Sequence, residues 1–284
     1  MGQRGQPALH DYTGYLLRRA FVKASGIAQE CMPDDAHVRE AAVLAIIEEH
    51  GALSQRELSD LTHVNQTLIV KLVDVLEHKG WVRRDRSPAD RRSYALAISA
   101  AGKHARTALD ADLDRGEADL TQNLTRDEVD ELRTLLTRLL DGDQALLVAS
   151  LANRTGYLIA HAHRRLRARA EGMLEPLGLH PRDFGALSAL AESQPCSQNA
   201  LALRMGITPP AALGLVDELE ARGLVARARK AGDRRFYDLT LSERGGEVLA
   251  QARKLAARAQ ADIVEHLGHD GDERLRVLLK KLID

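Results

Sequence analysis

The stretch from Ser54 to Gly102, SQRELSDLTHVNQTLIVKLVDVLEHKGWVRRDRSPADRRSYALAISAAG, decides the fold of this 284-residue chain. Ser54 followed by Glu57 has the spacing of a capping box, which predicts that a helix begins there. Asn65 can cap a second helix. In that helix, apolar residues recur at the i, i+3, i+4, i+7 spacing of one buried face: Ile69, Leu72, Val73 and Leu76.

The second part of the stretch predicts a β-hairpin. Gly80 stands where the end of a helix favours a left-handed residue. Val82 precedes an arginine-rich segment, and Tyr94, Leu96 and Ile98 alternate after it as strand residues do. A helix-turn-helix followed by a basic two-stranded wing is typical of modules that bind duplex DNA.

The same pattern occurs twice in the chain. Asp90 and Gly80 recur as Asp233 and Gly223, both at an offset of 143 residues, since 233 − 90 and 223 − 80 give the same number. Solenoid repeats have periods of up to about 50 residues, so this spacing indicates domain duplication. We expect two domains, residues 1–143 and residues 144–284.

Two segments carry a family resemblance. LVDVLEHKGWVRR from Leu72 and LVDELEARGLVAR from Leu215, each followed by Asp-Arg-Arg, resemble the winged-helix core of the MarR family of bacterial transcriptional regulators. Members of that family are usually homodimers of about half this length. The resemblance therefore implies a mainly α protein with small β-wings, in which two winged helix-turn-helix domains share a pseudo-two-fold helical base. Such a chain would act as a monomer that mimics a MarR dimer.

Composition places the chain among soluble cytoplasmic proteins. Its net charge is −1, from 40 basic and 41 acidic residues, so positive charge is concentrated only locally, at the wings. Two cysteines provide no disulfide framework. No signal peptide is recognisable, and the apolar run from Ala41 to Ile47 is too short to span a bilayer.

The two predicted recognition helices differ in chemistry. The outward positions of the first are Gln66, Thr67, Val70 and Lys71, three of which can hydrogen-bond to bases or phosphates. The aligned positions of the second are Pro209, Pro210, Leu213 and Gly214, whose side chains form no hydrogen bonds. We expect the first head to read bases and the second to anchor the protein. The alternative is that apolar residues of the second head read thymine methyl groups.

The arginines of the wings are the candidates for minor-groove or phosphate contacts, because arginine is the residue most often inserted into narrow minor grooves. The candidates are Arg86, Arg91, Arg92, Arg229, Arg234 and Arg235. The family resemblance implies that Asp90 and Asp233 orient neighbouring arginines. A wing that is only a solvated charged hairpin is the alternative.

The resemblance also implies an effector site, since family members often bind small aromatic or phenolic anions between the helical base and the winged domain. The candidate residues lie on the first helix of each half and at the start of the next: Tyr15, Arg18, Arg19, His37, Tyr157, His161 and His180. A cation there can hold a carboxylate. A purely structural role, in surface charge or a salt bridge, fits these residues equally well.

The sequence gives little indication of a metal or cofactor site, a reactive cysteine or an enzyme active site. His161 and His163 stand two residues apart and do not share a helix face, so we expect no metal and no cofactor. Cys31 and Cys196 lack the flanking charges of reactive thiols. No catalytic constellation indicates an enzyme.

The sequence thus predicts a DNA-binding transcriptional regulator, a repressor released by a small ligand. The alternative is a degenerate relative that binds small molecules or proteins without binding DNA specifically. The apolar outward positions of the second head are what favour that alternative.

Overall fold

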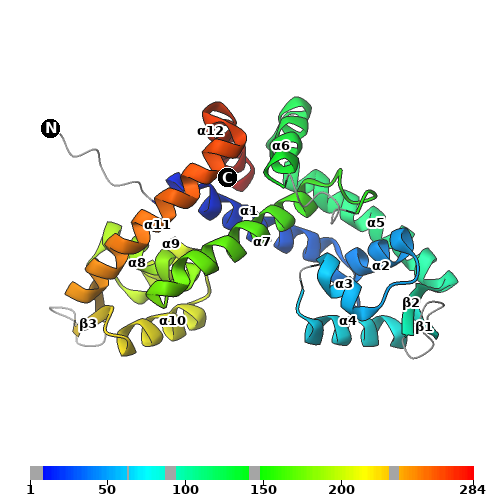
Figure 1. Cartoon of the computed structure of the whole chain (residues 1–284), viewed down its shortest axis with the longest axis horizontal. Coiled ribbons are helices and arrows are strands. Elements are labelled where there is room, and N and C mark those ends of the chain that lie inside the picture. Colours follow the sequence, from blue (N-terminus) through cyan, green and yellow to red (C-terminus); the bar gives the residue numbers. More distant parts are fainter. Residues whose placement is uncertain (1–8, 63, 87–93, 141–147, 230–236) are drawn as a thin grey trace. The chain divides into compact units, whose positions relative to one another are not determined.

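A computed structural model describes residues 9–62, 64–86, 94–140, 148–229 and 237–284. The chain forms two compact units, each discontinuous in sequence (Figure 1). Ala20–Arg164 with Val277–Asp284 make up the N-head unit, which contains the first winged module. Met1–Arg19 with Arg165–Arg276 make up the C-head unit, which contains the second. The predicted domain boundary after residue 143 lies outside the described residues.

The N-head unit is built mainly from the first half of the sequence. It holds the larger part of α1 (Thr13–Cys31) and the first ten residues of α7 (Thr155–Leu174). Between them come α2 (Val38–His50), α3 (Gln55–Thr62), α4 (Gln66–His78), β1 (Val82–Arg86), β2 (Tyr94–Ile98), α5 (Ala100–Thr121) and α6 (Arg126–Leu139).

The C-head unit repeats this order. It begins with η1 (Leu9–Asp11) and the start of α1, and continues with the rest of α7. The elements that follow are η3 (Glu175–Leu177), α8 (Pro181–Ser193), α9 (Gln198–Met205), α10 (Pro209–Ala221), β3 (Val225–Arg229), β4 (Tyr237–Leu241), α11 (Glu243–Leu267) and α12 (His269–Ile283), whose last turns belong to the N-head unit. A mainly α fold with two small β-hairpins was predicted and is confirmed. None of the described helices combines the length and hydrophobicity that a membrane crossing requires.

The predicted caps are confirmed. The Ser54 hydroxyl accepts a hydrogen bond from the Glu57 backbone N–H at 3.2 Å, and the Glu57 carboxylate accepts one from the Ser54 backbone at 2.8 Å. Asn65 Oδ1 accepts from the backbone N–H of Leu68 at 2.9 Å and starts α4. Gly80 has a φ of 71°, the left-handed conformation that turns the chain from α4 into the wing.

Each wing is an antiparallel pair of strands, and a short third segment pairs with the second strand of each. Val82 pairs with Ile98 in the first wing, and Val225 pairs with Leu241 in the second. A bridge from Leu53 to Leu96 adds the third segment, and Cys196 takes the corresponding place beside Leu239. The pairing gives the two wings the same register.

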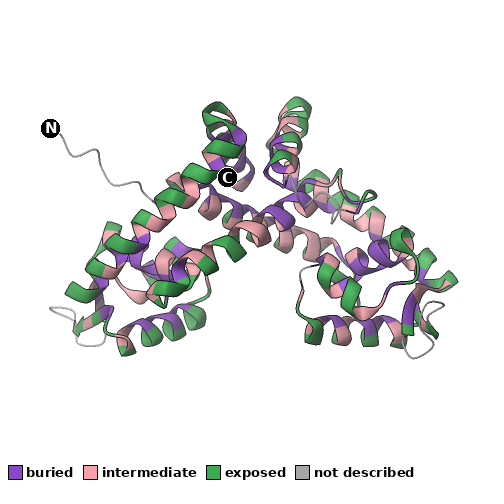
Figure 2. Cartoon of the chain, in the orientation of Figure 1, coloured by how far each residue is buried: buried purple, intermediate pink, exposed green. Residues whose placement is uncertain are grey.

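Each head has its own hydrophobic core, formed where the helices turn their apolar faces inward (Figure 2). Ile69, Val73 and Leu76 of α4 are fully buried, as the apolar spacing predicts. Val216 and Leu219 of α10 are equally buried in the second core. One face of each recognition helix is thereby fixed against its head, and the opposite face is left outward.

The first helix of each half begins in the unit that the other half builds. At the start of α1, the Thr13 hydroxyl donates to Asp272 Oδ1 at 2.5 Å, and the Thr13 backbone N–H donates to Gln260 Oε1 at 3.0 Å. At the start of α7, the Thr155 backbone N–H donates to Glu117 Oε1 at 2.7 Å. Thr13 and Thr155 are thus bound at equivalent places by helices of the opposite half.

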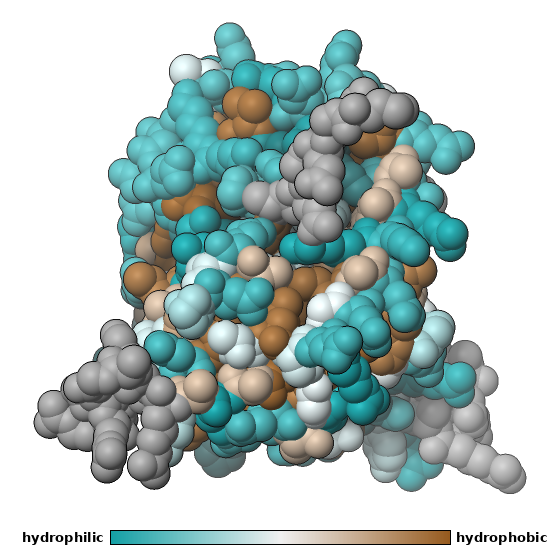
Figure 3. Space-filling view, turned by 90° about the vertical axis from the view of Figure 1, so that its left-hand side faces the viewer, coloured by the Kyte–Doolittle hydropathy of each residue, from teal (hydrophilic) through white to brown (hydrophobic). Residues whose placement is uncertain are grey.

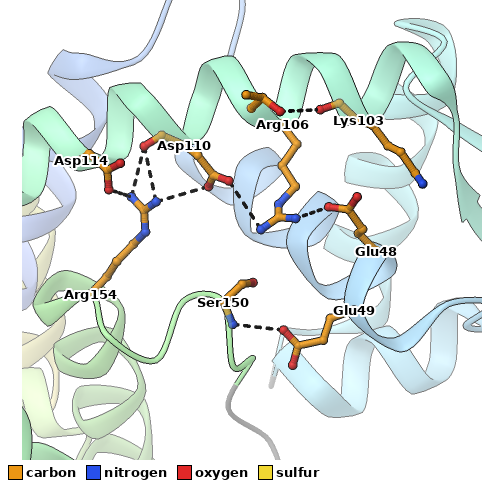
Figure 4. A network of polar contacts seen from close by, with 9 residues as sticks. Glu48, Glu49, Lys103, Arg106, Asp110, Asp114, Ser150 and Arg154 are labelled. Carbon is orange, nitrogen blue, oxygen red and sulfur yellow. Dashed lines mark hydrogen bonds and ion pairs between the residues drawn. The ribbon is translucent and has the colours of Figure 1, made fainter.

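The segment that precedes α7 is also docked on the first half (Figure 4). Glu49 at the end of α2 accepts hydrogen bonds from the backbone N–H groups of Ala149 at 2.7 Å and Ser150 at 3.1 Å. Arg154 reaches Asp114 of α5 at 3.1 Å and Asp110 at 3.4 Å. These contacts hold the described end of the connection, from residue 148, within the N-head unit.

Candidate nucleic-acid interface and effector site

The outward face of α4 carries the predicted base-reading residues. Gln66, Thr67 and Lys71 are exposed, and Val70 is half-buried beside them. Among the described residues, no hydrogen bond or ion pair engages the side chains of Gln66, Thr67 or Lys71. Their polar groups are therefore available to a partner, and their role in binding DNA stays a prediction.

The outward face of α10 is apolar. Pro209, Pro210, Leu213 and Gly214 are all exposed, and the Leu213 side chain has 47% of its surface accessible. Leu203 of the preceding α9 is 84% exposed, and brown hydrophobic residues show among hydrophilic ones on this side of the molecule (Figure 3). The second recognition helix thus offers shape and apolar surface in place of hydrogen bonds.

Charge separates the two helices as well. The thirteen residues of α10 include Asp217, Glu218 and Glu220 and no lysine or arginine. All three carboxylates are neutralised by arginines from neighbouring elements: Arg227 pairs with Asp217 and Glu220, and Arg182 pairs with Glu218 at 2.5 Å. The helix itself contributes no cation to a DNA contact.

An arginine of the first wing strand ties each wing to its recognition helix. Arg84 pairs with Asp74 at 2.5 Å and with Glu77 at 3.0 Å. Arg227 pairs with Asp217 at 2.5 Å and with Glu220 at 2.6 Å, at positions offset by 143. These ion pairs hold the first strand of each wing against its recognition helix.

A second duplicated ion pair holds the far end of each recognition helix. Lys79 contacts Glu40 at 2.6 Å and lies 4.6 Å from the centre of the Trp81 ring. Arg222 contacts the buried carboxylate of Asp183 at 2.9 Å. Helix α4 is thereby fixed against α2, and helix α10 against α8, so both heads keep the geometry of a reading module.

The tips of both wings lie outside the described residues. This applies to Arg91, Arg92, Arg234 and Arg235 and to the two supporting aspartates, Asp90 and Asp233. Arg86 is exposed at the end of β1. Arg229 ends β3, and only its backbone is described. The DNA contacts of the wing arginines stay predictions.

In the C-head unit, two of the candidate effector-site residues form hydrogen bonds with backbone carbonyl groups of the chain. The Tyr15 hydroxyl donates to the carbonyl oxygen of Arg204 at 3.2 Å, and Arg18 donates to that of Met205 at 2.9 Å. Both carbonyls end α9, just before the turn into α10. Burial lowers the pKa of Arg18 below its ordinary value. Arg19 is exposed.

In the N-head unit, Tyr157 and His161 lie together. Their ring centroids are 4.4 Å apart, His161 is buried, and the Tyr157 hydroxyl oxygen accepts from the backbone N–H of Val148 at 3.1 Å. Burial raises the pKa of Tyr157. His163, which the sequence places two residues on, stacks instead on Phe21 at 4.7 Å.

The two helix-start histidines occupy equivalent places in different units. His37 Nδ1 accepts from the backbone N–H of Arg39 at 3.1 Å and caps α2, and burial lowers the pKa of this imidazole. The backbone N–H of His180 donates to Asp183 at 3.0 Å at the start of α8. Within the described residues, no three histidine, cysteine or acidic side chains are grouped as metal ligands.

Arg164 is a residue that the sequence analysis did not single out. It lies on α7 two turns after Tyr157, and its Nε is buried without a hydrogen-bond partner. No ion pair or hydrogen bond to its guanidinium is present among the described residues. Burial lowers its pKa most, and nearby Arg39 acts in the same direction. Helix α7 is rich in arginine, so only the three-dimensional surroundings distinguish this one.

Residues 38–94 and residues 177–235 each match a model described as MarR family. The HTH-type transcriptional repressor Rv2887 of Mycobacterium tuberculosis is 30% identical over 127 residues, which cover 45% of this chain and 91% of that repressor. A putative transcriptional regulatory protein for the hcr operon of Thauera aromatica is 36% identical over 97 residues, 34% of this chain and 58% of that protein.

Among solved structures, the transcriptional repressor CouR bound to a 23-mer DNA duplex is similar to one half of the chain. Its sequence identity is 32%, its TM-score is 0.46, and the match covers 47% of this chain and 95% of the CouR chain.

Proposed function

Because this chain belongs to the MarR family of DNA-binding transcriptional regulators, we propose that it is a single-chain repressor whose two heads bind one operator unequally. The observation that carries the proposal is the contrast between α4 and α10. Three polar side chains of α4 face outward without partners among the described residues, while α10 presents proline, leucine and glycine at the same positions.

The exchange of first helices supports the single-chain arrangement. Thr13 is held by Asp272 and Gln260 of the second half, and Thr155 is held by Glu117 of the first half. In a two-fold homodimer, such an exchange would occur between subunits. Here one polypeptide supplies both partners of each exchange.

The duplicated clamps support binding by both heads. Arg84 and Arg227 fix each wing relative to its recognition helix, so the second head retains the geometry of a DNA-binding module although its outward residues have changed. Contacts to phosphates position a protein on DNA, and contacts to base edges specify the sequence. The second head then anchors through its wing and backbone, and the first head supplies most of the base specificity.

Release by a small ligand is the remaining part of the proposal. Tyr157, His161 and Arg164 bring a hydroxyl, an imidazole and a guanidinium onto one side of α7, within the same unit as the base-reading head. A small anion bound there would alter the packing of α7 in that unit and thereby lower operator affinity.

Titration of the protein against the DNA upstream of its own gene tests this function. We expect one chain per operator, and a large difference in affinity between the operator and random DNA at both low and moderate salt. Gln66→Ala with Lys71→Ala should reduce that difference by at least tenfold, because each specific contact contributes about 1–3 kcal/mol.

Leu213→Ala is the matched control on the second head. A change as large as that of the α4 variant would mean that the second head also reads bases, through thymine methyl groups. Binding that is weak, indifferent to sequence and abolished by moderate salt would instead identify a degenerate relative without operator recognition.

A further inference from the structure

The turn that follows α9 leads directly into the second recognition helix. An α-helix leaves its last four backbone carbonyl groups without partners inside the helix. The turn itself satisfies two of those in α9. The backbone N–H of Ile207 donates to the carbonyl oxygen of Ala202 at 3.1 Å, and that of Gly206 donates to Leu203 at 3.2 Å. The last two carbonyl groups of α9 need donors from elsewhere.

Side chains of α1 supply those donors. The Tyr15 hydroxyl donates to the carbonyl oxygen of Arg204 at 3.2 Å, and Arg18 Nη1 donates to that of Met205 at 2.9 Å. Tyr15 and Arg18 are three residues apart, so they lie on the same face of α1. Both belong to the C-head unit, together with α9. Two residues of the first half of the sequence thus complete the helix that precedes α10.

Arg18 is committed to this contact by its charge. It is half-buried, and no carboxylate of the described residues pairs with it. Burial lowers its pKa most, and the positive charges of Arg167 and Arg19 act in the same direction. The C-terminal end of a helix carries partial negative charge and favours a cation. The end of α9 therefore gives Arg18 the electrostatic partner that a carboxylate would otherwise provide.

The first head closes the corresponding helix with its own hydroxyl groups. The Thr62 hydroxyl donates to the Leu58 carbonyl at 2.7 Å, and the Ser59 hydroxyl donates across the following turn at 2.6 Å. At the offset of 143, Met205 and Ala202 stand in place of Thr62 and Ser59. Neither has a hydroxyl group. The second helix-turn-helix therefore lacks these local donors, and its end is held from α1.

The equivalent positions of α7 do not provide the same brace to the first head. Tyr157 and Ala160 stand 142 residues after Tyr15 and Arg18. The alanine side chain has neither charge nor donor, and the Tyr157 hydroxyl oxygen accepts from the backbone N–H of Val148. The two heads thus differ in what holds the turn before the recognition helix.

We propose that Arg18 and Tyr15 are positioning residues for DNA binding, which hold the turn before α10 and thereby fix the second recognition helix within its head. This inference rests on the proposed anchoring by the second head and names the residues that orient that anchor. The outward side chains of α10 form no hydrogen bonds, so this head depends on the placement of its backbone and wing. A fixed turn is what keeps that placement.

Hydrogen exchange of the full chain without DNA, followed by mass spectrometry, tests the brace. In Arg18→Met, peptides spanning residues 198–213 should exchange at least about tenfold faster, because hydrogen bonds from charged groups are among the strongest and the turn opens more easily without one. Peptides spanning α4 should keep their rates. Tyr15→Phe, which removes a single hydroxyl group, should have a smaller effect on the same peptides.

Two further variants separate the brace from a general loss of stability. Arg18→Lys should keep part of the protection, since lysine retains the charge and a donor. Arg258→Met is the matched control, because Arg258 is an exposed arginine of α11 in the same unit and has no partner among the described residues. Its exchange should equal that of the unmodified chain.

Hydroxyl-radical footprinting on the operator tests the effect on DNA binding. In Arg18→Met, protection should be lost over the half-site of the second head and kept over the half-site contacted by α4. Arg18→Lys should recover part of it. A merely structural role would weaken protection of both half-sites alike.

Unchanged exchange in Arg18→Met, or an equal rise in both heads, would overturn the proposal. A footprint that stays the same over both half-sites although exchange has risen would do so as well. If the unmodified chain gave no specific footprint, the proposed function would fail instead, and exchange without DNA would still decide whether the brace exists.

Discussion

Gly245 should be among the least replaceable residues of the C-head unit. A Cβ atom at this position would lie 2.0 Å from the backbone oxygen of Leu224, where real contacts essentially never fall below 3.0 Å. Helix α11 would have to move away from the wing by about 1 Å. The same collision occurs in the first half, where a Cβ at Gly102 would lie 2.0 Å from the oxygen of Trp81.

The cost of Gly245→Ala follows from the hydrogen bonds that this close approach permits. Ser242 donates from its backbone to Leu224 at 3.1 Å and from its hydroxyl to Gly223 at 2.6 Å, and it accepts from Gly245 at 2.9 Å. Moving α11 away breaks the two bonds to Gly223 and Leu224, which costs about 2 kcal/mol, since each contributes about 1 kcal/mol net. Alanine recovers about 1 kcal/mol through its helix propensity, which leaves a destabilisation of about 1 kcal/mol.

The neighbouring residue provides the matched control. Gly246 lies in the same turn of α11, and a Cβ there meets nothing within 4 Å, so Gly246→Ala should stabilise the unit by up to about 1 kcal/mol. Urea unfolding followed by circular dichroism measures both variants. Equal shifts for Gly245→Ala and Gly246→Ala would refute the reasoning, because the two differ only in the contact with the wing.

Three further predictions concern the heads and their connection. Lys71→Ala should lower the slope of log affinity against log salt by about 0.9 if Lys71 contacts one phosphate, and Gln66→Ala should leave that slope unchanged. In thermal unfolding, the stability of both variants should lie within about 0.5 kcal/mol of that of the unmodified protein, since the fold uses neither side chain. Arg227→Ala should weaken DNA binding in a low-salt gel-shift titration, because Asp217 and Glu220 lose the cation that neutralises them, and unchanged binding would contradict the clamp. Burial raises the pKa of Glu49, but hydrogen bonds from Ala149 and Ser150 outweigh it and hold that pKa below its ordinary value. The contribution of Glu49 to stability is therefore present above the ordinary pKa and is lost as the pH falls through the lower folded-state pKa. Glu49→Gln should flatten the fall of the unfolding free energy at acid pH, and an unaltered fall would count against this role.

Local signals in the sequence predict the local structure of each head. The pair Ser54 and Glu57, the cap at Asn65 and the glycines at positions 80 and 223 mark element ends through short-range hydrogen bonding and backbone conformation. At the 143-residue offset, Ser197 caps α9 without a matching glutamate, and Thr208 caps α10 where Asn65 caps α4. The winged modules therefore follow from the sequence with few differences in their bounds.

Long-range pairing does not follow in the same way. Nothing near Thr13 indicates that Asp272, 259 residues later, is its partner, because an exposed helix start and an exchanged one have the same local pattern. Arg84 and Arg227 resemble the other wing arginines until the carboxylates beneath them are located. Arg164 is identified only by what surrounds it, since the burial of its Nε and the lack of a partner among the described residues are properties of the folded unit.

The repeat also shows how a duplicated module can diverge without losing its scaffold. Ion pairs that hold each head together keep their charge pattern, as with Lys79 and Glu40 against Arg222 and Asp183. The outward residues of α4 and α10, which do not contribute to the core, differ between the two halves.

A substitution scan of the operator tests the central claim most directly. Each base pair of both half-sites is replaced in turn, and the affinity of the single chain is measured at fixed salt. We predict that losses of about 1–3 kcal/mol per substitution are confined to one half-site, the one contacted by α4. Equal losses at corresponding positions of both half-sites would contradict the account.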